Sequence, residues 1–211
     1  RGGDAVGFML PVFDFDGTLT SADTLLEFIR FACGRGRMLF GFALYSPLLV
    51  LMKLRLYPNY KAKQKVFARF FRGMPLDEFD KLCTAFARQN ERLLRPAARR
   101  FIDEIRGEAS GMAIVSASID NWVRPFAEQY LGSQRDGLPI LVLGTQVETG
   151  PDGRLTGRFA TPNCYGAEKV RRIESVWPDR AVYDLSAFGD SRGDKEMLAY
   201  ADQGYFKPFR F

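Results

Sequence analysis

The 211-residue sequence contains no histidine. This absence excludes Ser-His-Asp and Cys-His nucleophilic catalysis, HExxH metalloproteases and zinc sites with histidine ligands. Any chemistry that the chain performs must therefore rely on carboxylates, hydroxyls, lysine, arginine and a metal ion that prefers oxygen ligands.

Cysteines and long apolar runs are also scarce. The three cysteines, Cys33, Cys83 and Cys164, are far apart and form no CxxC pair. This pattern argues against a disulfide framework and a cysteine-only zinc site, and it favours a reducing cytoplasm. Neither GxxxxGK[ST] nor GxGxxG occurs. Because there is no apolar run of ~18 residues and no secretory leader, we expect a cytoplasmic protein, although targeting information upstream of Arg1 stays open.

Strand-like and helix-like segments alternate on both sides of a long helical insertion. The apolar segment Val6–Phe13 predicts a buried strand, and residues 21–95 are almost wholly helical in pattern. From Gly111 onward, predicted strands over 112–115, 139–145 and 181–188 alternate with helices, and a hairpin is predicted over 145–159. This order predicts an α/β fold, a Rossmann-like parallel sheet with helices on both faces, built from residues 1–20 and 96–211.

Two boundaries in this prediction rest on small residues. Gly34 and Gly36 are expected to end the first helix of the insertion, which begins near Thr24. The strand over 112–115 is expected to end at the segment Ser116–Ser118.

Polar side chains follow three of the predicted strands directly. They are Asp14 and Asp16, Ser116 and Ser118, and Asp190 and Asp194. The carboxyl ends of parallel strands meet at one edge of a sheet, where ligands bind in folds of this class. The sequence therefore predicts one site at this edge. Simpler alternatives are a solvated turn for the first pair, a strand-end cap for Ser116 and a helix N-terminus for the last pair.

Four motifs in this order resemble those of the haloacid dehalogenase superfamily, in its phosphoserine-phosphatase-like branch (subfamily IB). The segment Asp14-Phe-Asp-Gly-Thr18 resembles the first motif, DxDxT, and Ser116 after Ala-Ile-Val is similar to the second. Lys169 in Gly-Ala-Glu-Lys looks like the third motif, although an exposed helix lysine is the alternative. The segment Gly189–Asp194 resembles the fourth, GDxxxD.

The resemblance implies a Mg²⁺-dependent phosphatase. Asp14, the backbone carbonyl of Asp16 and the side chain of Asp190 would hold the ion, which suits the preference of Mg²⁺ for oxygen. Asp14 would attack phosphorus and form an aspartyl-phosphate. Asp16 would protonate the leaving group and then deprotonate the hydrolytic water, which explains the need for a second carboxylate.

The resemblance also assigns supporting roles around these carboxylates. Ser116 would bind the phosphate, with Ser118 as a rival, and Lys169 would neutralise its charge. Asp194, with Ser191 beside it, would orient Lys169 or a metal-bound water, and Thr18 would brace the loop. Asp23 is placed either to contact a substrate amino group or to cap the following helix.

The insertion, residues 21–95, would form a helical cap that decides the substrate. Residues 28–76 contain ten Lys and Arg residues and no Asp or Glu, whereas the whole chain has a net charge of +5. The apolar run Met38–Met52 lies in the same segment. This combination leaves three interpretations open: a cap core with a solvated basic face, an anionic membrane surface, or another anionic partner. No nucleic-acid-binding motif supports nucleic acid.

We therefore expect a phosphomonoester hydrolase for an anionic small-molecule or lipid-like phosphate. The alternatives are a membrane-surface or lipid-binding protein of this fold with little turnover, or a phosphotransferase. The cap arginines Arg55, Arg69 and Arg72 are the candidates for gripping a substrate anion. The sequence leaves the oligomeric state open.

Overall fold

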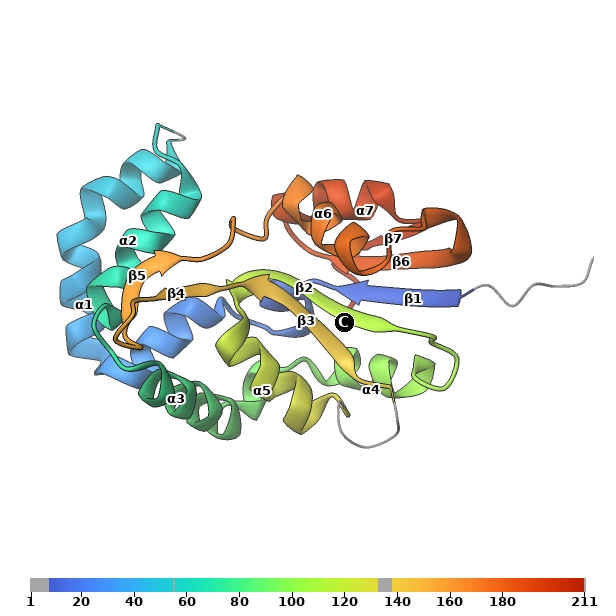
Figure 1. Ribbon diagram of the computed structural model, residues 1–211, viewed down its shortest axis with the longest axis horizontal. Helices are drawn as coiled ribbons and strands as arrows, with labels where there is room; N and C mark the ends of the chain where they lie inside the picture. The colour runs from blue at the N-terminus through green and yellow to red at the C-terminus, as the bar shows by residue number, and fades with distance from the viewer. Residues whose placement is uncertain (1–7, 55, 133–137, 211) are drawn as a thin grey trace, which may run out of the picture.

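A five-stranded parallel sheet forms the centre of the protein (Figure 1). The computed structural model describes residues 8–54, 56–132 and 138–210. The strand order is β3-β2-β1-β6-β7, and every neighbouring pair is parallel. The strands are β1 (Phe8–Phe13), β2 (Met112–Ile119), β3 (Ile140–Thr145), β6 (Tyr183–Gly189) and β7 (Gln203–Phe206).

Helices cover both faces of this sheet, as the alternation of elements predicts. One face carries α4 (Pro96–Ile105) and α5 (Asp120–Tyr130), and the other carries α6 (Ala167–Val176) and α7 (Lys195–Tyr200) (Figure 1). Side chains of β1 alternate between the two apolar clusters, because successive residues of a strand point to opposite faces. Phe13 belongs to the cluster with α5, and Val12 to the cluster with α6 and α7. The predicted fold class is confirmed.

The central strand β2 is longer than the sequence predicts. It continues through Ser116 and Ser118 to Ile119, and its pairing with β3 is irregular between Val115 and Ile119. Serine hydroxyls are compatible with extended backbone, so the expected end at Ser116 is wrong. The irregularity breaks the regular ladder beside these serines. Strand β7, at the edge of the sheet, was not predicted at all; its four residues are exposed, and the pair Tyr205 and Phe206 is too short an apolar run to indicate a strand.

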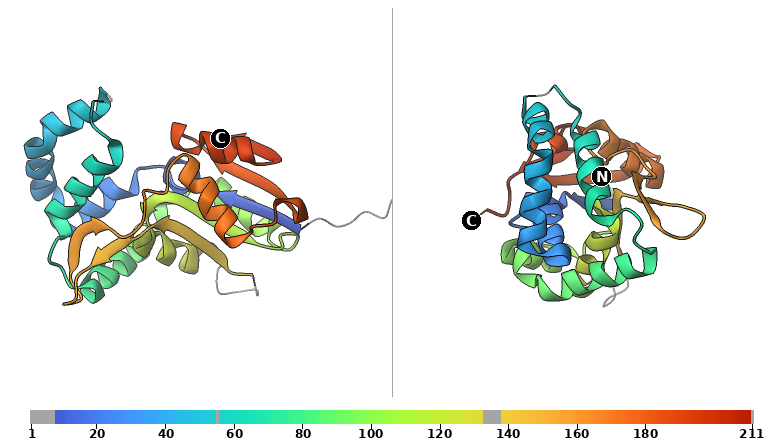
Figure 2. Two further views of the ribbon diagram at one scale, coloured as in Figure 1. Left: turned by 45° about the horizontal axis from the view of Figure 1, so that its top comes forward. Right: turned by 90° about the vertical axis from the view of Figure 1, so that its left-hand side faces the viewer.

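The helical insertion consists of α1 (Thr24–Lys53), α2 (Asn59–Phe71) and α3 (Leu76–Gln89). The expected end at Gly34 is a kink instead: Gly34 has φ 79° and ψ 160°, and the chain returns to helix directly after it. Glycine accepts this backbone conformation without a Cβ clash. Pro47 lies inside the second half of α1. Figure 2 shows α1 and α2 at the end of the molecule away from β7.

A short hairpin joins the insertion to the remainder of the chain. Strands β4 (Val147–Thr149) and β5 (Leu155–Phe159) form it, close to the predicted range. The Leu155 carbonyl accepts the Gly73 N–H at 2.8 Å, and the Leu155 N–H donates to the Met74 carbonyl at 2.9 Å. These bonds hold the hairpin against the segment between α2 and α3 (Figure 1). The predicted division into a core (1–20 and 96–211) and a cap (21–95) stays a prediction. Two parts of 96–211 pack on the cap helices: this hairpin, and α5 (Asp120–Tyr130), whose Phe126 ring lies 5.7 Å from the Phe86 ring of α3.

None of the helices in the described ranges combines the length and the hydrophobicity that crossing a bilayer requires.

Candidate active site

The loop after β1 brings its two aspartates to the carboxyl edge of the sheet. Phe15 and Leu19 anchor the loop because both side chains are fully buried. Gly17, between the anchors, has φ 79°, and a Cβ on it would lie 2.4 Å from an Asp190 carboxylate oxygen. Glycine at this position therefore allows both the left-handed turn and the close approach of the loop after β6.

Lys169 is the positive centre of the site. It lies on α6 and is almost fully buried, and its Nζ lies 2.6 Å from Asp14 Oδ1 and 2.5 Å from Asp194 Oδ1. Burial lowers the pKa of Lys169, but the two carboxylates outweigh it and raise the pKa overall, so the ammonium stays charged. The interpretations of Lys169 as an exposed lysine and of Asp14 as a solvated turn are therefore wrong.

Burial also dominates the electrostatics of Asp14. It raises the pKa of this carboxyl to about 7, although Lys169 acts in the opposite direction. The Thr18 hydroxyl donates to Asp14 Oδ2 at 3.3 Å and is also 3.4 Å from Asp190 Oδ1. Thr18 thus braces the loop, as predicted, by bridging two carboxylates.

Both carboxylate oxygens of Asp194 accept hydrogen bonds from neighbouring groups of the site. Its Oδ2 accepts the backbone N–H groups of Asp190 and Ser191 and the Ser191 hydroxyl, at 2.9–3.1 Å, while Oδ1 accepts from Lys169. Ser191 in turn caps the short helix Arg192–Asp194. Burial opposes ionisation of Asp194, but Lys169 outweighs it and the pKa is lowered. Of the two predicted roles for Asp194, the geometry matches the orientation of Lys169.

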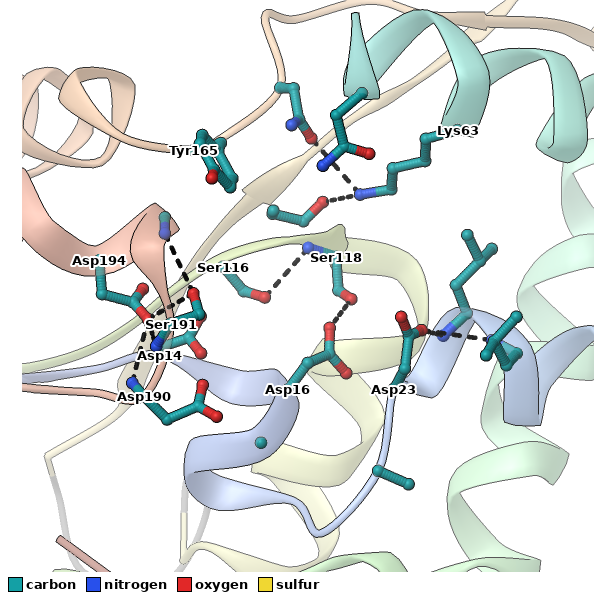
Figure 3. Close-up of a pocket in the computed structure, with 18 of the residues that line it drawn as sticks. Asp14, Asp16, Asp23, Lys63, Ser116, Ser118, Tyr165, Asp190, Ser191 and Asp194 are labelled. Atoms are coloured by element: carbon teal, nitrogen blue, oxygen red, sulfur yellow. Dashed lines mark hydrogen bonds between the residues drawn. The ribbon is translucent and has the colours of Figure 1, made fainter. Parts of the chain in front are cut away.

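Asp16 points away from this cluster toward the first helix of the insertion (Figure 3). Its Oδ1 accepts hydrogen bonds from the Thr24 backbone N–H and hydroxyl at 2.8 and 2.6 Å, and Oδ2 accepts from the Ser118 hydroxyl. Burial, helped by the charge of Asp23, raises the pKa of Asp16 against these hydrogen bonds. A partly buried carboxyl with a raised pKa suits a group that must carry a proton to a leaving atom.

The two serines of β2 have different surroundings. The Ser118 hydroxyl bonds to Asp16 and lies 3.3 Å from Thr24 Oγ1. The Ser116 Oγ accepts the Ser118 backbone N–H at 3.0 Å, which leaves its hydroxyl hydrogen available for a ligand. Of the two serines, the geometry favours Ser116 as the phosphate contact.

The carboxylates beside Lys169 suit a divalent cation. Oxygen atoms of Asp14, Asp190 and Asp194 lie within 4.8 Å of one another. Asp194 uses one oxygen for Lys169 and the other for the loop, whereas Asp14 and Asp190 each keep one oxygen outside their ion pairs with Lys169 and Arg210. Asp14 and Asp190 therefore stay the predicted side-chain ligands for an ion such as Mg²⁺. The Asp16 side chain lies elsewhere, so its predicted metal contact rests on its backbone carbonyl. Sequence reasoning missed Arg210, whose Nη2 lies 2.6 Å from Asp190 Oδ2.

These groups line a cavity of about 580 Å³ between the sheet edge and the insertion. Asp23 lies at its wall and caps α1 by accepting the Leu25 and Leu26 N–H groups at 2.9 and 3.3 Å. Both alternatives for Asp23 are therefore compatible with its position. The apolar part of the wall comes mainly from α1, through Leu25, Leu26, Phe42, Leu49 and Met52.

Among the cap residues that the structure describes, Lys63 is the cation that lines this cavity, and sequence reasoning did not single it out. Its Nζ donates to the Ala117 backbone carbonyl and lies 3.4 Å from Asn163 Oδ1 (Figure 3). Burial lowers the pKa of Lys63 to about 8, although Asp16 and Asp23 act in the opposite direction. Arg69 and Arg72 do not line the cavity, and Arg55 lies outside the described residues. The only sequence signal for Lys63 was its place in the basic segment.

Comparison with known proteins identifies the family. The sequence model of the haloacid dehalogenase-like hydrolases matches residues 12–199. The chain belongs to this family. Protein CicA of Caulobacter vibrioides is 35% identical to this haloacid dehalogenase-like hydrolase over 206 residues, which cover 96% of this chain and 87% of that protein.

Solved structures show the same fold at lower sequence identity. A Bordetella pertussis Tohama I protein of unknown function has a TM-score of 0.75 and 18% identity, covering 92% of this chain and 87% of its own. A phosphoserine phosphatase, solved as an analogue of its phospho-aspartyl intermediate, has a TM-score of 0.63 and 21% identity, covering 92% and 84%. Membership of the haloacid dehalogenase superfamily, read from four motifs, is confirmed, and the assignment to its phosphoserine-phosphatase-like branch stays a prediction.

Proposed function

We propose that this haloacid dehalogenase-like hydrolase is a phosphatase that hydrolyses phosphomonoesters through an aspartyl-phosphate on Asp14. The observation that carries the proposal is the buried contact of 2.6 Å between Lys169 Nζ and Asp14 Oδ1 at the wall of an open cavity. The Lys169 ammonium opposes the rise in the pKa of Asp14 that burial causes, and it offsets the repulsion between the Asp14 carboxylate and an anionic substrate in a low-dielectric site.

In the first step, an Asp14 oxygen forms a bond to phosphorus while the ester P–O bond breaks. The electron pair of the broken bond goes to the leaving oxygen, which takes a proton from Asp16. Mg²⁺ bound by Asp14 and Asp190 would supply additional positive charge at the phosphate oxygens. Ser116 and the backbone N–H groups of the Asp14–Thr18 loop hold those oxygens in place.

In the second step, water cleaves the aspartyl-phosphate. Asp16, now ionised, takes a proton from the water as its oxygen attacks phosphorus, and the Asp14 carboxylate is released with inorganic phosphate. The Ser118 and Thr24 hydrogen bonds keep the Asp16 carboxyl in one orientation through both steps. Water replaces the leaving group on the same side of the phosphoryl group, so a single residue serves both proton transfers.

The cavity wall indicates the kind of substrate. Apolar side chains of α1 and the Lys63 side chain line the same cavity, so a ligand with an apolar part and an anionic group matches both. This pairing supports an anionic small-molecule or lipid-like phosphate as substrate.

The test compares the wild type with Asp14→Asn on a generic aryl phosphate in Mg²⁺, with Asp152→Asn in the exposed hairpin turn as control. We expect turnover to be abolished only in Asp14→Asn, and acid-quenched wild type to carry one phosphoryl group on Asp14. Full turnover by Asp14→Asn would overturn the assignment of the nucleophile. Phosphorylated alcohols as the main product, with competing alcohols present, would identify a phosphotransferase instead.

A further inference from the structure

The second half of α1 exposes a row of large apolar side chains on the side turned away from the cavity. Their exposed fractions range from 41% to 65%. We call this set the α1 outer face; its residues are Leu39, Phe40, Leu44, Val50 and Leu51 of α1, and Leu54 at the C-cap of the helix. In Figures 1 and 2 this helix lies at the end of the molecule away from β7.

The side chains on the two sides of α1 have different surroundings. Phe42, Leu49 and Met52 face the cavity, and Gly41 is buried against α2, where a Cβ would lie 2.4 Å from the Phe70 ring. At 3.6 residues per turn, Leu44 and Leu51 fall on the other side. A surface helix normally presents polar side chains to water, so this exposed apolar face indicates a binding surface.

The charges around the α1 outer face have one sign. Between Arg37 and Lys53 the helix has fifteen residues without a charged side chain, and both flanking cations are exposed. Arg35, which is also exposed, adds a second positive charge next to Arg37. The segment 28–76 as a whole has ten cations and no acidic residue. The surface is therefore apolar in the middle and positive at both ends.

We propose that the α1 outer face docks on the surface of an anionic lipid bilayer. A helix lying in the interface buries its apolar side among the acyl chains while its cations reach lipid phosphates, and this surface offers both features. A second copy of the chain fits less well. Pairing two such faces would bring the cations of both copies together, and residues 28–76 contain no carboxylate to compensate.

Docking would bring the cavity close to the membrane. The α1 outer face and the apolar cavity wall are opposite sides of one helix, whose diameter with side chains is about 10 Å.

The test is flotation with vesicles of phosphatidylcholine containing 30% phosphatidylglycerol, and with vesicles of phosphatidylcholine alone, as probes. We expect wild type to float with the anionic vesicles and to be released by high salt. Leu44→Asp/Leu54→Asp should lower the bound fraction at least tenfold. The matched control Val182→Asp/Phe206→Asp, which changes equally exposed residues outside α1, should bind like wild type. Arg37→Ala should weaken binding about fivefold, as expected for one cation at an anionic surface.

Three outcomes would overturn the proposal: wild type that stays with the lipid-free fraction, equal binding to neutral and anionic vesicles, or unchanged binding by Leu44→Asp/Leu54→Asp. A wild-type dimer that the same double variant converts to a monomer, without vesicle binding, would assign the face to a second copy. Docking does not depend on catalysis, so Asp14→Asn should float like wild type, and Leu44→Asp/Leu54→Asp should keep its turnover of a water-soluble aryl phosphate.

Discussion

The Lys169 ammonium lies 2.6 Å from the Asp14 carboxylate, and both side chains are almost completely buried. Removing one partner of a buried ion pair leaves the other charge without compensation, which costs about 3–5 kcal/mol. Lys169 also neutralises Asp194, so its loss would leave two carboxyl groups next to each other in the interior.

We therefore expect Lys169→Met to lower the free energy of unfolding by about 3–5 kcal/mol and to abolish turnover. Urea denaturation followed by circular dichroism measures the first effect. Arg171→Met, two residues along α6 and exposed, is the matched control and should change stability by less than about 0.5 kcal/mol. Wild-type stability in Lys169→Met would show that the ion pair is not formed in solution.

Gly17→Ala should inactivate the protein, because the added Cβ would collide with the Asp190 carboxylate. This collision adds to the backbone strain of an alanine in the left-handed region. Gly73 has a similar φ, 85°, but a Cβ there meets nothing within 4 Å. Both variants should lose about 1–2 kcal/mol of stability, as expected for a left-handed non-glycine residue. Only Gly17→Ala should lose turnover, by a hundredfold or more. Equal turnover in the two variants would contradict the tight packing of the two acidic loops.

The two serines of β2 should affect different kinetic constants. Ser116→Ala removes the free hydroxyl that we assign to the phosphate and should raise KM or lower kcat/KM about tenfold. Ser118→Ala removes a hydrogen bond that favours ionised Asp16, so its main effect should be on kcat and its pH profile, which should shift toward higher pH. Steady-state kinetics on an aryl phosphate between pH 5 and pH 9 separates the two. Identical profiles would contradict the assignment.

Lys63 should make substrate binding sensitive to pH. Burial lowers its pKa to about 8, compared with about 10.5 in the unfolded chain. The partly buried ammonium therefore destabilises the folded protein below pH 8, and this cost disappears as the pH rises from 8 to 10.5. If its charge attracts the substrate, KM should rise about tenfold through pH 8 while kcat changes little.

Lys63→Arg keeps its charge at these pH values and should remove the rise in KM. Lys63→Met should have the high KM at every pH, whereas Lys61→Met, an exposed neighbour on α2, should behave like wild type. A pH-dependent KM in Lys63→Met would assign the titration to another group.

The sequence predicts the parts of this protein that depend on short-range pattern. The apolar segment before Asp14 and the alternation after Gly111 are sufficient for the sheet and its two helical faces. The strand ends before Asp14 and Asp194 are sufficient to bring these two residues together, because strand ends in a parallel sheet share one edge. Lys169 follows no strand, and only the resemblance to the third motif placed it in the site. The burial of Lys169 then distinguishes the functional interpretation from the simple ones.

What the sequence does not predict depends on contacts between distant segments. Lys63 is one of ten cations in its segment, and only the fold brings it to the Ala117 carbonyl. Arg210 reaches Asp190 in the same way. Gly34 signals a break in the helix, but whether the chain turns or continues depends on packing between α1 and α2.

The two hydrogen bonds from Thr24 to Asp16 have a mechanical consequence. Thr24 is the first residue of α1, and the Trp122 indole also donates to its hydroxyl at 3.0 Å. Any displacement of the start of α1 would take two donors away from the Asp16 carboxylate and make the carboxyl a weaker acid. The pKa of Asp16 would thus depend on the position of the start of α1. The carboxyl would be the stronger acid when Thr24 lies against it, and the weaker acid when Thr24 has moved away.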